Sequence, residues 1–287
     1  MRLSIENYVI RKHFGDEQAI AMLTEAGFDA MDFSFYWMPK EENFLDRDDY
    51  LDHARAVRIW ADKAGIAITQ AHAPFDLNIL YDSKEKQAYD YEQIRRAIAC
   101  AGAMGIEQII VHNLITANAA DFKEVNLKFF RSLEPDAAKA GVRIAVENLW
   151  GIDDGKIVGG RLSTPATLSA FLDKLDPAHF CGCIDLGHAA IVGEDPAQFI
   201  RNLGVPKLAA LHVQDTDLMH DTHTLPYLGK HDWDAITSAL AETDYDGDLT
   251  FEIFAFLGAL PKETLGEALE LAHSVGRKLI NDIEKKR

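Results

Sequence analysis

The chain has 287 residues, of which 48% are hydrophobic and 26% are charged, a composition typical of a globular protein. This length suits two small domains or one α/β barrel, which usually takes about 250 residues. The formal net charge of −17 repels nucleic-acid phosphates and anionic lipid, so neither is an expected partner.

Eight short runs of β-branched or apolar residues alternate with stretches of helical periodicity. Most of the runs end in a polar residue, and a loop separates each from the helical stretch that follows. The predicted strands span residues 2–7, 30–35, 66–73, 108–113, 143–148, 180–185, 207–214 and 248–254. The predicted helices span residues 16–27, 49–65, 83–105, 120–141, 163–175, 195–203, 233–243 and 262–286.

Glycines mark the ends of the first four predicted helices. Gly27, Gly65, Gly105 and Gly141 each stand where a left-handed C-terminal cap favours glycine. Eight strand–helix units are what a (β/α)8 TIM barrel requires, and the alternation indicates a parallel sheet. A doubly wound open sheet is the alternative, but no G-x-G-x-x-G motif follows a strand. We therefore predict an α/β fold with one (β/α)8 TIM barrel domain over residues 1–287.

The cysteines carry no motif for redox or metal chemistry. Cys100, Cys181 and Cys183 form no C-x-x-C pair, so we interpret all three as buried thiols in a reducing compartment. The first residues lack the apolar core of a signal peptide, and no apolar stretch reaches the roughly 18 residues of a membrane span. We expect a cytoplasmic protein.

Carboxylates and imidazoles stand at the ends of the last six predicted strands. Barrel active sites lie at the C-terminal ends of the strands, so these side chains are expected to meet at one mouth. Acids and histidines flanked by apolar residues need a partner, and a divalent cation supplies one. The mixed ligand types suit Mn, Zn, Co or Fe more than Ca. The residues are His72, His112, Glu147, Asp185 with His188 just beyond it, His212 and Glu252.

Four motifs at these strand ends resemble those of the xylose isomerase-like TIM barrel superfamily, in particular its sugar phosphate isomerase/epimerase branch. The superfamily also contains inosose dehydratases and the endonuclease IV type of apurinic-site nuclease. The resemblance covers essentially the whole chain. The motifs are Val146-Glu147-Asn148, Ile184-Asp185-Leu186-Gly187-His188, Leu211-His212-Val213-Gln214-Asp215 and Phe251-Glu252-Ile253.

The resemblance implies a divalent metal ion, Mn, Zn, Co or Mg, held by Glu147, Asp185, His212 and Glu252. It also implies that the two glutamates are the acid–base pair and that His188 contacts a substrate oxygen. The expected enzyme is a metal-dependent sugar isomerase or epimerase. It would act on a ketose, a ketose phosphate or a related polyol by proton transfer through an enediolate.

Two other activities fit the same pocket. A lyase or dehydratase acting on a keto-sugar or inosose would use the same residues. The nuclease branch uses nine ligands around three zinc ions, and His72, His112, Asp221 and His223 fall where its extra ligands would be. These four residues are therefore predicted to bind additional metal or substrate. Two features argue against the nuclease. The residues after Asp185 are Leu-Gly, as in the sugar enzymes, and the sequence has no evident basic cluster for DNA.

Several residues near the predicted mouth are candidates for substrate binding. Trp37 and Trp150 follow strands two and five, and an aromatic face can stack on a sugar ring. Arg161 and Lys230 are nearby cations that could hold a phosphate or hydroxyl group. Two segments, 151–161 and 38–48, are candidate lids. A homo-oligomer is a further expectation from the resemblance.

Overall fold

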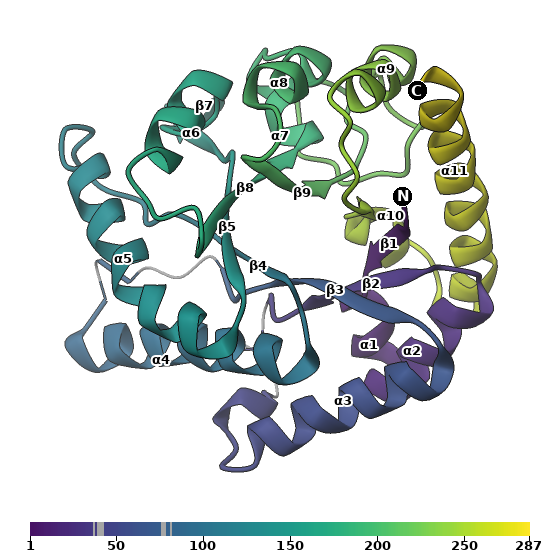
Figure 1. The fold of residues 1–287 in the computed structure, drawn as a ribbon, viewed down its shortest axis with the longest axis horizontal. Coiled ribbons are helices and arrows are strands. Elements are labelled where there is room, and N and C mark those ends of the chain that lie inside the picture. Colours follow the sequence, from purple (N-terminus) through teal and green to yellow (C-terminus); the bar gives the residue numbers. More distant parts are fainter. Residues whose placement is uncertain (37, 39–42, 76–78, 81) are drawn as a thin grey trace.

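The structure is a computed structural model that describes the whole chain except residues 37, 39–42, 76–78 and 81. Its centre is a ring of eight parallel strands with helices around it (Figure 1). Neighbouring strands follow the order β10–β1–β2–β3–β4–β5–β8–β9. They are β1 (Leu3–Glu6), β2 (Ala30–Ser34), β3 (Ala67–His72), β4 (Gln108–Val111), β5 (Arg143–Glu147), β8 (Phe180–Asp185), β9 (Leu208–His212) and β10 (Leu249–Phe251).

The ring closes between β9 and β10. The Val213 amide donates to the Thr250 carbonyl at 2.8 Å, and the Glu252 amide donates to the Val213 carbonyl at 3.1 Å. All eight predicted strands are present, and the prediction of a (β/α)8 TIM barrel is confirmed. The C-terminal ends of the strands therefore meet at one mouth.

Eight main helices form the outer layer, one after each strand of the ring (Figure 1). The helix α8 shows how the sequence directs them. Asp195 caps its N-terminus by accepting from the amides of Ala197 and Gln198, and Pro196 occupies its first turn. The main helices are α2 (Asp16–Glu25), α3 (Tyr50–Ala64), α4 (Lys84–Met104), α5 (Phe122–Ala140), α6 (Pro165–Leu172), α8 (Pro196–Leu203), α9 (Trp233–Glu242) and α11 (Leu265–Lys286).

Glycine caps end α3, α4 and α5 where the sequence predicts them. Gly105 after α4 and Gly141 after α5 both have a φ of 72°, in the left-handed region that penalises a Cβ atom. Each chain reversal then leads into the next strand. Among the described residues, no helix is long and apolar enough to cross a lipid bilayer.

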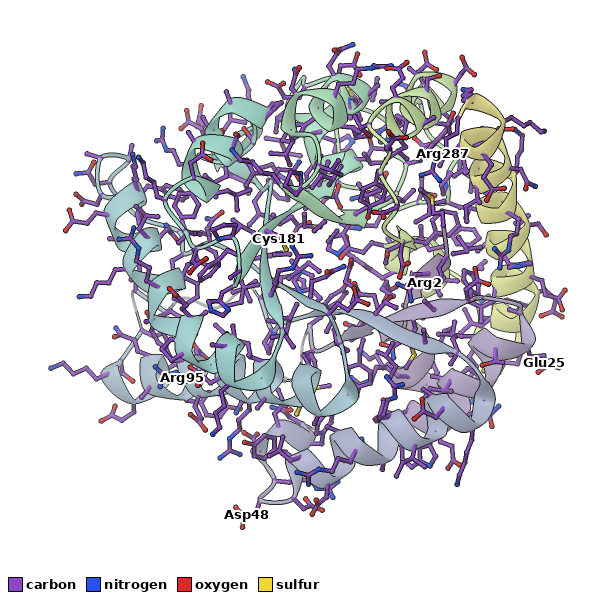
Figure 2. The ribbon with its side chains drawn as sticks, in the orientation of Figure 1. Arg2, Glu25, Asp48, Arg95, Cys181 and Arg287 are labelled. Atoms are coloured by element: carbon purple, nitrogen blue, oxygen red, sulfur yellow. The ribbon has the colours of Figure 1, made fainter. Side chains whose placement is uncertain are left out.

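The interior of the ring changes character along the strands. In the middle of β4, β5, β8 and β9 it holds a small apolar cluster of Ile110, Ala145, Cys181, Cys183 and Ala210. Figure 2 shows Cys181 inside the ring, whereas Glu25, Asp48 and Arg95 lie on the periphery. All three cysteines are free and buried, as predicted. The next inward-facing positions toward the mouth are polar.

Some elements were not predicted. A hairpin of β6 (Trp150–Asp153) and β7 (Lys156–Gly159) occupies the glycine-rich segment predicted as a loop. Its turn residues Asp154 and Gly155 both have positive φ, as an Asp-Gly hairpin turn requires. The other additions among the described residues are short helices after strands, α1 (Tyr8–Phe14), α7 (Leu186–Ile191) and α10 (Phe254–Gly258), and a 3-10 turn at Phe44–Asp46. The predicted last helix begins as a 3-10 turn at Lys262–Thr264.

Candidate active site at the barrel mouth

Four side chains from neighbouring strands converge at the mouth, and we call them the inner cluster. Glu147, Asp185 and His212 are the last residues of β5, β8 and β9, and Glu252 directly follows β10. All four are buried, and each offers one ligand atom within 4.8 Å of those of the others. The fold thus brings together the four residues that the resemblance implied as metal ligands.

His212 lies between the two glutamates of the inner cluster. Its Nδ1 is 2.9 Å from Glu147 Oε1 and 3.2 Å from Glu252 Oε2. One ring nitrogen carries at most one proton, so it satisfies only one of these oxygens. Glu147 Oε2 and Glu252 Oε2 have no well-directed hydrogen-bond donor although both are buried. Buried oxygens of this kind, grouped around an imidazole, suit a divalent cation.

The two glutamates have different electrostatic surroundings. Burial raises the pKa of Glu147, but the imidazoles of His212 and His112 outweigh it and hold that pKa well below its ordinary value. Burial raises the pKa of Glu252, and His212 and His223 oppose this only in part. The acids Glu147 and Asp185 add to the increase. The two carboxyls are therefore not equivalent before any ligand binds.

A second layer of polar groups, on β2, just after it and on β3, lies against the inner cluster. Tyr36 donates its hydroxyl to Glu252 Oε1 at 2.6 Å. Asp32 Oδ2 lies 3.7 Å from His212 Nε2 and accepts from the Gln70 amide at 2.6 Å. Asp32 thus faces the ring nitrogen opposite the glutamates, the side on which metal-binding histidines usually have a carboxylate, but the distance is longer than a hydrogen bond.

The sequence prediction missed these supporting residues. It began the functional set at strand three, yet Glu6 on β1 and Asp32 on β2 are acids among apolar neighbours that stand in strands too. Burial raises the pKa of Glu6 to about 8, with a smaller contribution from Glu252. The criterion that selected Glu147 would have found both. Tyr36 carried no signal, because its partner is 216 positions away in the chain.

Two histidines lie on one side of the inner cluster and form the side group with Glu147. His112 Nε2 is 2.9 Å from Glu147 Oε2 and 3.1 Å from His72 Nε2. His72 Nδ1 donates to the Ala73 carbonyl at 2.7 Å, which leaves its Nε2 free to accept or ligate. Ligand atoms of all three residues lie within 4.8 Å of one another.

An outer group lies beside Asp185, built from α7 and the loop after β9. Asp221 Oδ2 is 3.3 Å from His188 Nε2, and Asp221 Oδ1 is 3.2 Å from His223 Nε2. Trp150 also donates its indole N–H to Asp221 Oδ2 at 3.1 Å. His188 and His223 share with Asp185 a third set of ligand atoms within 4.8 Å. Every predicted histidine and acid of the site is therefore in one connected cluster.

The loop after β9 holds the outer group through Asp215. The Asp215 carboxylate accepts from the amides of Thr216 and His231 and, on its other oxygen, from the Tyr227 amide and the Trp233 indole. A Cβ atom on Gly229 would lie 2.2 Å from Asp215 Oδ1, so only glycine fits there. The loop also places His223 at a φ of 38°, a strained backbone typical of functional segments.

The other predicted substrate contacts are only partly described. Trp37 lies outside the described residues, as does part of the predicted lid 38–48. Trp150 lies in the mouth beside Asp221. Arg161 and Lys230 are exposed, and within the described part of the chain no hydrogen bond or ion pair joins either side chain to the cluster. Their role in substrate binding stays a prediction.

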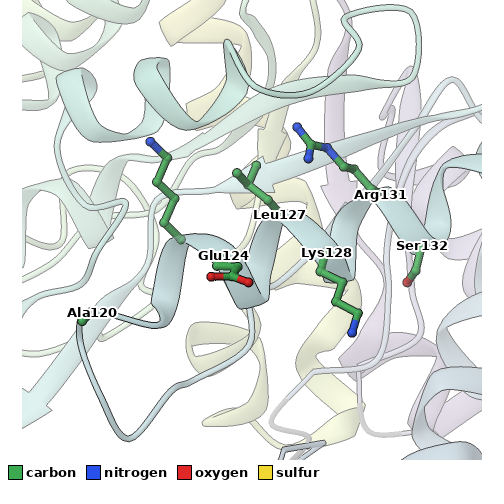
Figure 3. Close-up of a pocket in the computed structure, with 7 residues that line it drawn as sticks. Ala120, Glu124, Leu127, Lys128, Arg131 and Ser132 are labelled. Atoms are coloured by element: carbon green, nitrogen blue, oxygen red, sulfur yellow. The ribbon is translucent and has the colours of Figure 1, made fainter.

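A surface hollow of about 700 Å³ lies elsewhere, along the exposed face of α5 (Figure 3). Its lining includes Lys123, Lys128 and Arg131 beside Glu124. All of its lining residues come from this one helix and the residues before it, and it holds no imidazole. The buried ligand atoms of Glu147, His212 and Glu252 that lack a hydrogen-bond partner are at the mouth, so we place the chemistry there.

The family description of the xylose isomerase-like TIM barrel matches residues 20–278. The chain therefore belongs to this family, as the motifs implied. A curated relative, the uncharacterised protein y4fM of Sinorhizobium fredii (strain NBRC 101917 / NGR234), is 33% identical over 171 residues. The match covers 56% of this chain and 51% of the relative, so the chain spans about half the length of that protein.

Solved structures with the same fold include three sugar epimerases or epimerase-like proteins. A D-tagatose 3-epimerase-like protein is 20% identical with a TM-score of 0.72, over 98% of this chain and 100% of its own. An L-ribulose 3-epimerase is 20% identical with a TM-score of 0.73, over 100% and 95%. The 3-keto-D-glucoside 4-epimerase of E. coli is 18% identical with a TM-score of 0.71, over 96% and 99%. These likenesses establish a common fold.

Proposed function

We propose that this chain is a divalent-metal-dependent isomerase or epimerase of a ketose or related polyol. The observation that carries the proposal is the inner cluster, in which two buried glutamates flank one histidine and keep oxygens without donors. The names of the structurally similar proteins, which are epimerases of tagatose, ribulose and a keto-glucoside, support the substrate class.

Glu147, Asp185, His212 and Glu252 would hold the metal ion. When bound, a divalent ion there supplies a Lewis acid for the carbonyl and adjacent hydroxyl oxygens of a ketose. One glutamate removes the proton from the carbon next to the carbonyl, and the other returns a proton from the opposite face. His188 donates a hydrogen bond to a substrate oxygen on the same side as Asp221.

We propose further that the substrate is not phosphorylated. The mouth contains buried acids on or directly after five strands, and its described cationic groups are imidazoles that already face those acids. A phosphate would enter a field of like charge unless Arg161 or Lys230 moved inward. A ketose should therefore react faster than its phosphate ester.

The test is hydrogen exchange in D2O with the Mn-loaded protein and a panel of ketoses, ketose phosphates and inososes, followed by mass spectrometry. Incorporation of deuterium together with a new isomer supports the proposal. A product lighter by one water identifies a dehydratase instead. Exchange that is faster with phosphate esters than with free ketoses overturns the substrate class but leaves the reaction type.

One observation favours a second candidate, a phosphodiesterase of the apurinic-site nuclease type. The side group and the third set of ligand atoms flank the inner cluster, so the mouth has donors for more than one ion. The net charge of −17 opposes binding to DNA. Cleavage of an oligonucleotide with one abasic site, without exchange on any sugar, would favour this candidate over the epimerase.

A further inference from the structure

The amide of Gln214 occupies the centre of the outer group. Its Nε2 lies 3.1 Å and 3.0 Å from the two Asp185 oxygens and 3.2 Å from Asp221 Oδ1. It is also 3.3 Å from His223 Nε2. Three carboxylate oxygens and one imidazole nitrogen thus surround one amide nitrogen that has only two hydrogens. Gln214 is fully buried, so no solvent competes for these contacts.

The orientation of this amide is fixed by the backbone. Gln214 Oε1 accepts from the His223 amide at 2.8 Å. A backbone N–H can only donate, so it must face the oxygen of the side chain and not the nitrogen. The amino end of Gln214 therefore points toward Asp185 and Asp221.

The chain also leaves room for this side chain. A Cβ atom on Gly187 would lie 2.5 Å from Gln214 Cδ and 2.7 Å from Gln214 Nε2. Any larger residue at position 187 would displace the amide from its acceptors. The glycine after Leu186 and the glutamine after Val213 thus fit each other, although 27 positions separate them in the sequence.

We propose that the Gln214 amide takes the place of a divalent cation between Asp185, Asp221 and His223, and so restricts metal ions to the inner cluster and the side group. Carboxylate oxygens and imidazole nitrogens ligate first-row metals at about 2.0–2.2 Å. The amide nitrogen fills the space among these four atoms, and its two N–H groups use the acceptors that an ion would need.

This inference deepens the proposed function and rests on it only in taking the mouth to bind divalent cations. With an amide in place of an ion, His188 and Asp221 keep their remaining polar atoms for substrate. His188 Nδ1 is buried and makes no hydrogen bond to the described residues, and its contact with Glu147 Oε1 is 3.5 Å long. The outer group, with the Gln214 amide in place of a metal ion, can thus bind hydroxyl groups of a sugar.

The test counts metal ions bound per chain in Gln214→Glu and the wild type. This substitution keeps the shape of the side chain but replaces the donor with a carboxylate, so a cation is needed among the acids. Each protein is dialysed against Mn²⁺ or Zn²⁺, and bound metal is measured by mass spectrometry. We expect one more equivalent per chain in Gln214→Glu than in the wild type.

Three further variants complete the design. Gln214→Ala also removes the donor and should gain the same equivalent, which guards against poor folding of the glutamate variant. Gln108→Glu places the same new charge on β4, where Gln108 donates to the Ala209 carbonyl, and should gain none. Adding His223→Ala to Gln214→Glu should remove the extra equivalent.

Equal metal content in the wild type and both Gln214 variants overturns the proposal. Loss of one equivalent from the wild type on His223→Ala also overturns it, because an ion would then already occupy the outer group. Proton exchange on sugars is measured separately. A wild type without exchange whose Gln214 variants still gain one equivalent would refute the epimerase and support the role of Gln214.

Discussion

Two buried carboxylates near the end of β9 have opposite surroundings. Asp215 accepts four hydrogen bonds at 2.9–3.1 Å, three from backbone amides and one from the Trp233 indole. Glu252 accepts one hydrogen bond at Oε1 from Tyr36, and its Oε2 has no well-directed donor. Both side chains are almost completely buried, so exposure does not distinguish them.

The number of hydrogen-bond donors distinguishes a buried carboxylate with a structural role from one that is available for chemistry. Removing a carboxylate from water is costly unless donors replace the water, and Asp215 has its replacement within the protein. Glu252 and Glu147 lack part of theirs, which leaves their oxygens available to a cation or a substrate proton. A buried acid in a barrel is therefore not by itself a sign of function, whereas several buried acids at the mouth, each with an oxygen that lacks a donor, indicate a ligand site.

The largest effect is expected when Glu252, which has a carboxylate oxygen without a hydrogen-bond donor, is neutralised. Glu252→Gln keeps the size of the side chain but removes a proton acceptor, and we expect proton exchange on the substrate to fall by about 1,000-fold or more. Burial raises the pKa of Glu252, so its ionised form is disfavoured in the folded protein. The metal-free variant should therefore be at least as stable as the wild type in urea unfolding.

The matched control for this prediction is Glu242→Gln. Glu242 is exposed and pairs with Arg201 on the outer helices, so its variant should retain full activity. Exchange at the wild-type rate in Glu252→Gln would remove Glu252 from the acid–base pair. A large loss of stability in the same variant would mean that the side chain is structural and would contradict the comparison with Asp215.

Neutralising Asp215, whose two carboxylate oxygens each accept two hydrogen bonds, should instead destabilise the fold. Asp215→Asn turns two hydrogen-bond acceptors into one acceptor and one donor, which then faces N–H groups. We expect a loss of about 3 kcal/mol in the free energy of unfolding, because buried donors lose their acceptor. Urea unfolding of the metal-free protein measures it. Activity should fall as well, because the loop that carries Asp221 and His223 depends on Asp215.

Trp233→Phe gives a graded control. It removes one of the four donors to Asp215 and leaves the carboxylate, so its cost should be about 1 kcal/mol. A cost for Asp215→Asn no greater than that for Trp233→Phe would show that the hydrogen bonds of Asp215 contribute little. The carboxylate of Asp215 would then resemble that of Glu252, whose surroundings do not replace its hydration.

Much of the fold and part of the site could be predicted because the information is local. Strand ends and helix caps are written in short stretches of sequence, and the barrel topology brings all strand ends to one mouth. Glu147, Asp185, His212 and Glu252 followed from this rule, and the structure places their ligand atoms together. Their binding of metal stays a prediction.

The rest of the site depends on contacts between distant segments. Nothing near Tyr36 indicates that its hydroxyl meets Glu252, and nothing near Gly187 indicates that it makes room for Gln214. The hairpin of β6 and β7 is a different case, because its Asp154-Gly155 turn was present in the sequence and was not used. Packing, and not residue type, decides which buried acids have hydrogen-bond donors for both carboxylate oxygens.

A third kind of buried carboxylate sharpens the comparison further. Both oxygens of Asp16 have side-chain partners: Arg11 Nε is 2.7 Å from Oδ1 and His53 Nε2 is 2.7 Å from Oδ2. Burial raises the pKa of Asp16, but Arg11 and His53 together hold it well below its ordinary value. Its side chain is only 10% exposed, so solvent screens these contacts weakly.

The sign of the resulting pH dependence follows from this depressed pKa. The unfolded chain takes up the Asp16 proton at a pH of about 4, whereas the folded chain holds the carboxylate ionised to a lower pH. Asp16 therefore stabilises the fold fully above pH of about 4, and this contribution decreases as the pH falls further. Asp16→Asn should lose about 2 kcal/mol of unfolding free energy at pH 7.

Urea unfolding of the wild type, Asp16→Asn and Glu17→Gln between pH 7 and pH of about 3 tests this. Glu17 is the exposed neighbour of Asp16, so its variant should match the wild type throughout. The difference between Asp16→Asn and the wild type should shrink as the solution becomes acidic. A difference independent of pH would mean that Asp16 acts through shape and hydrogen bonding, as Asp215 does, and not through its charge.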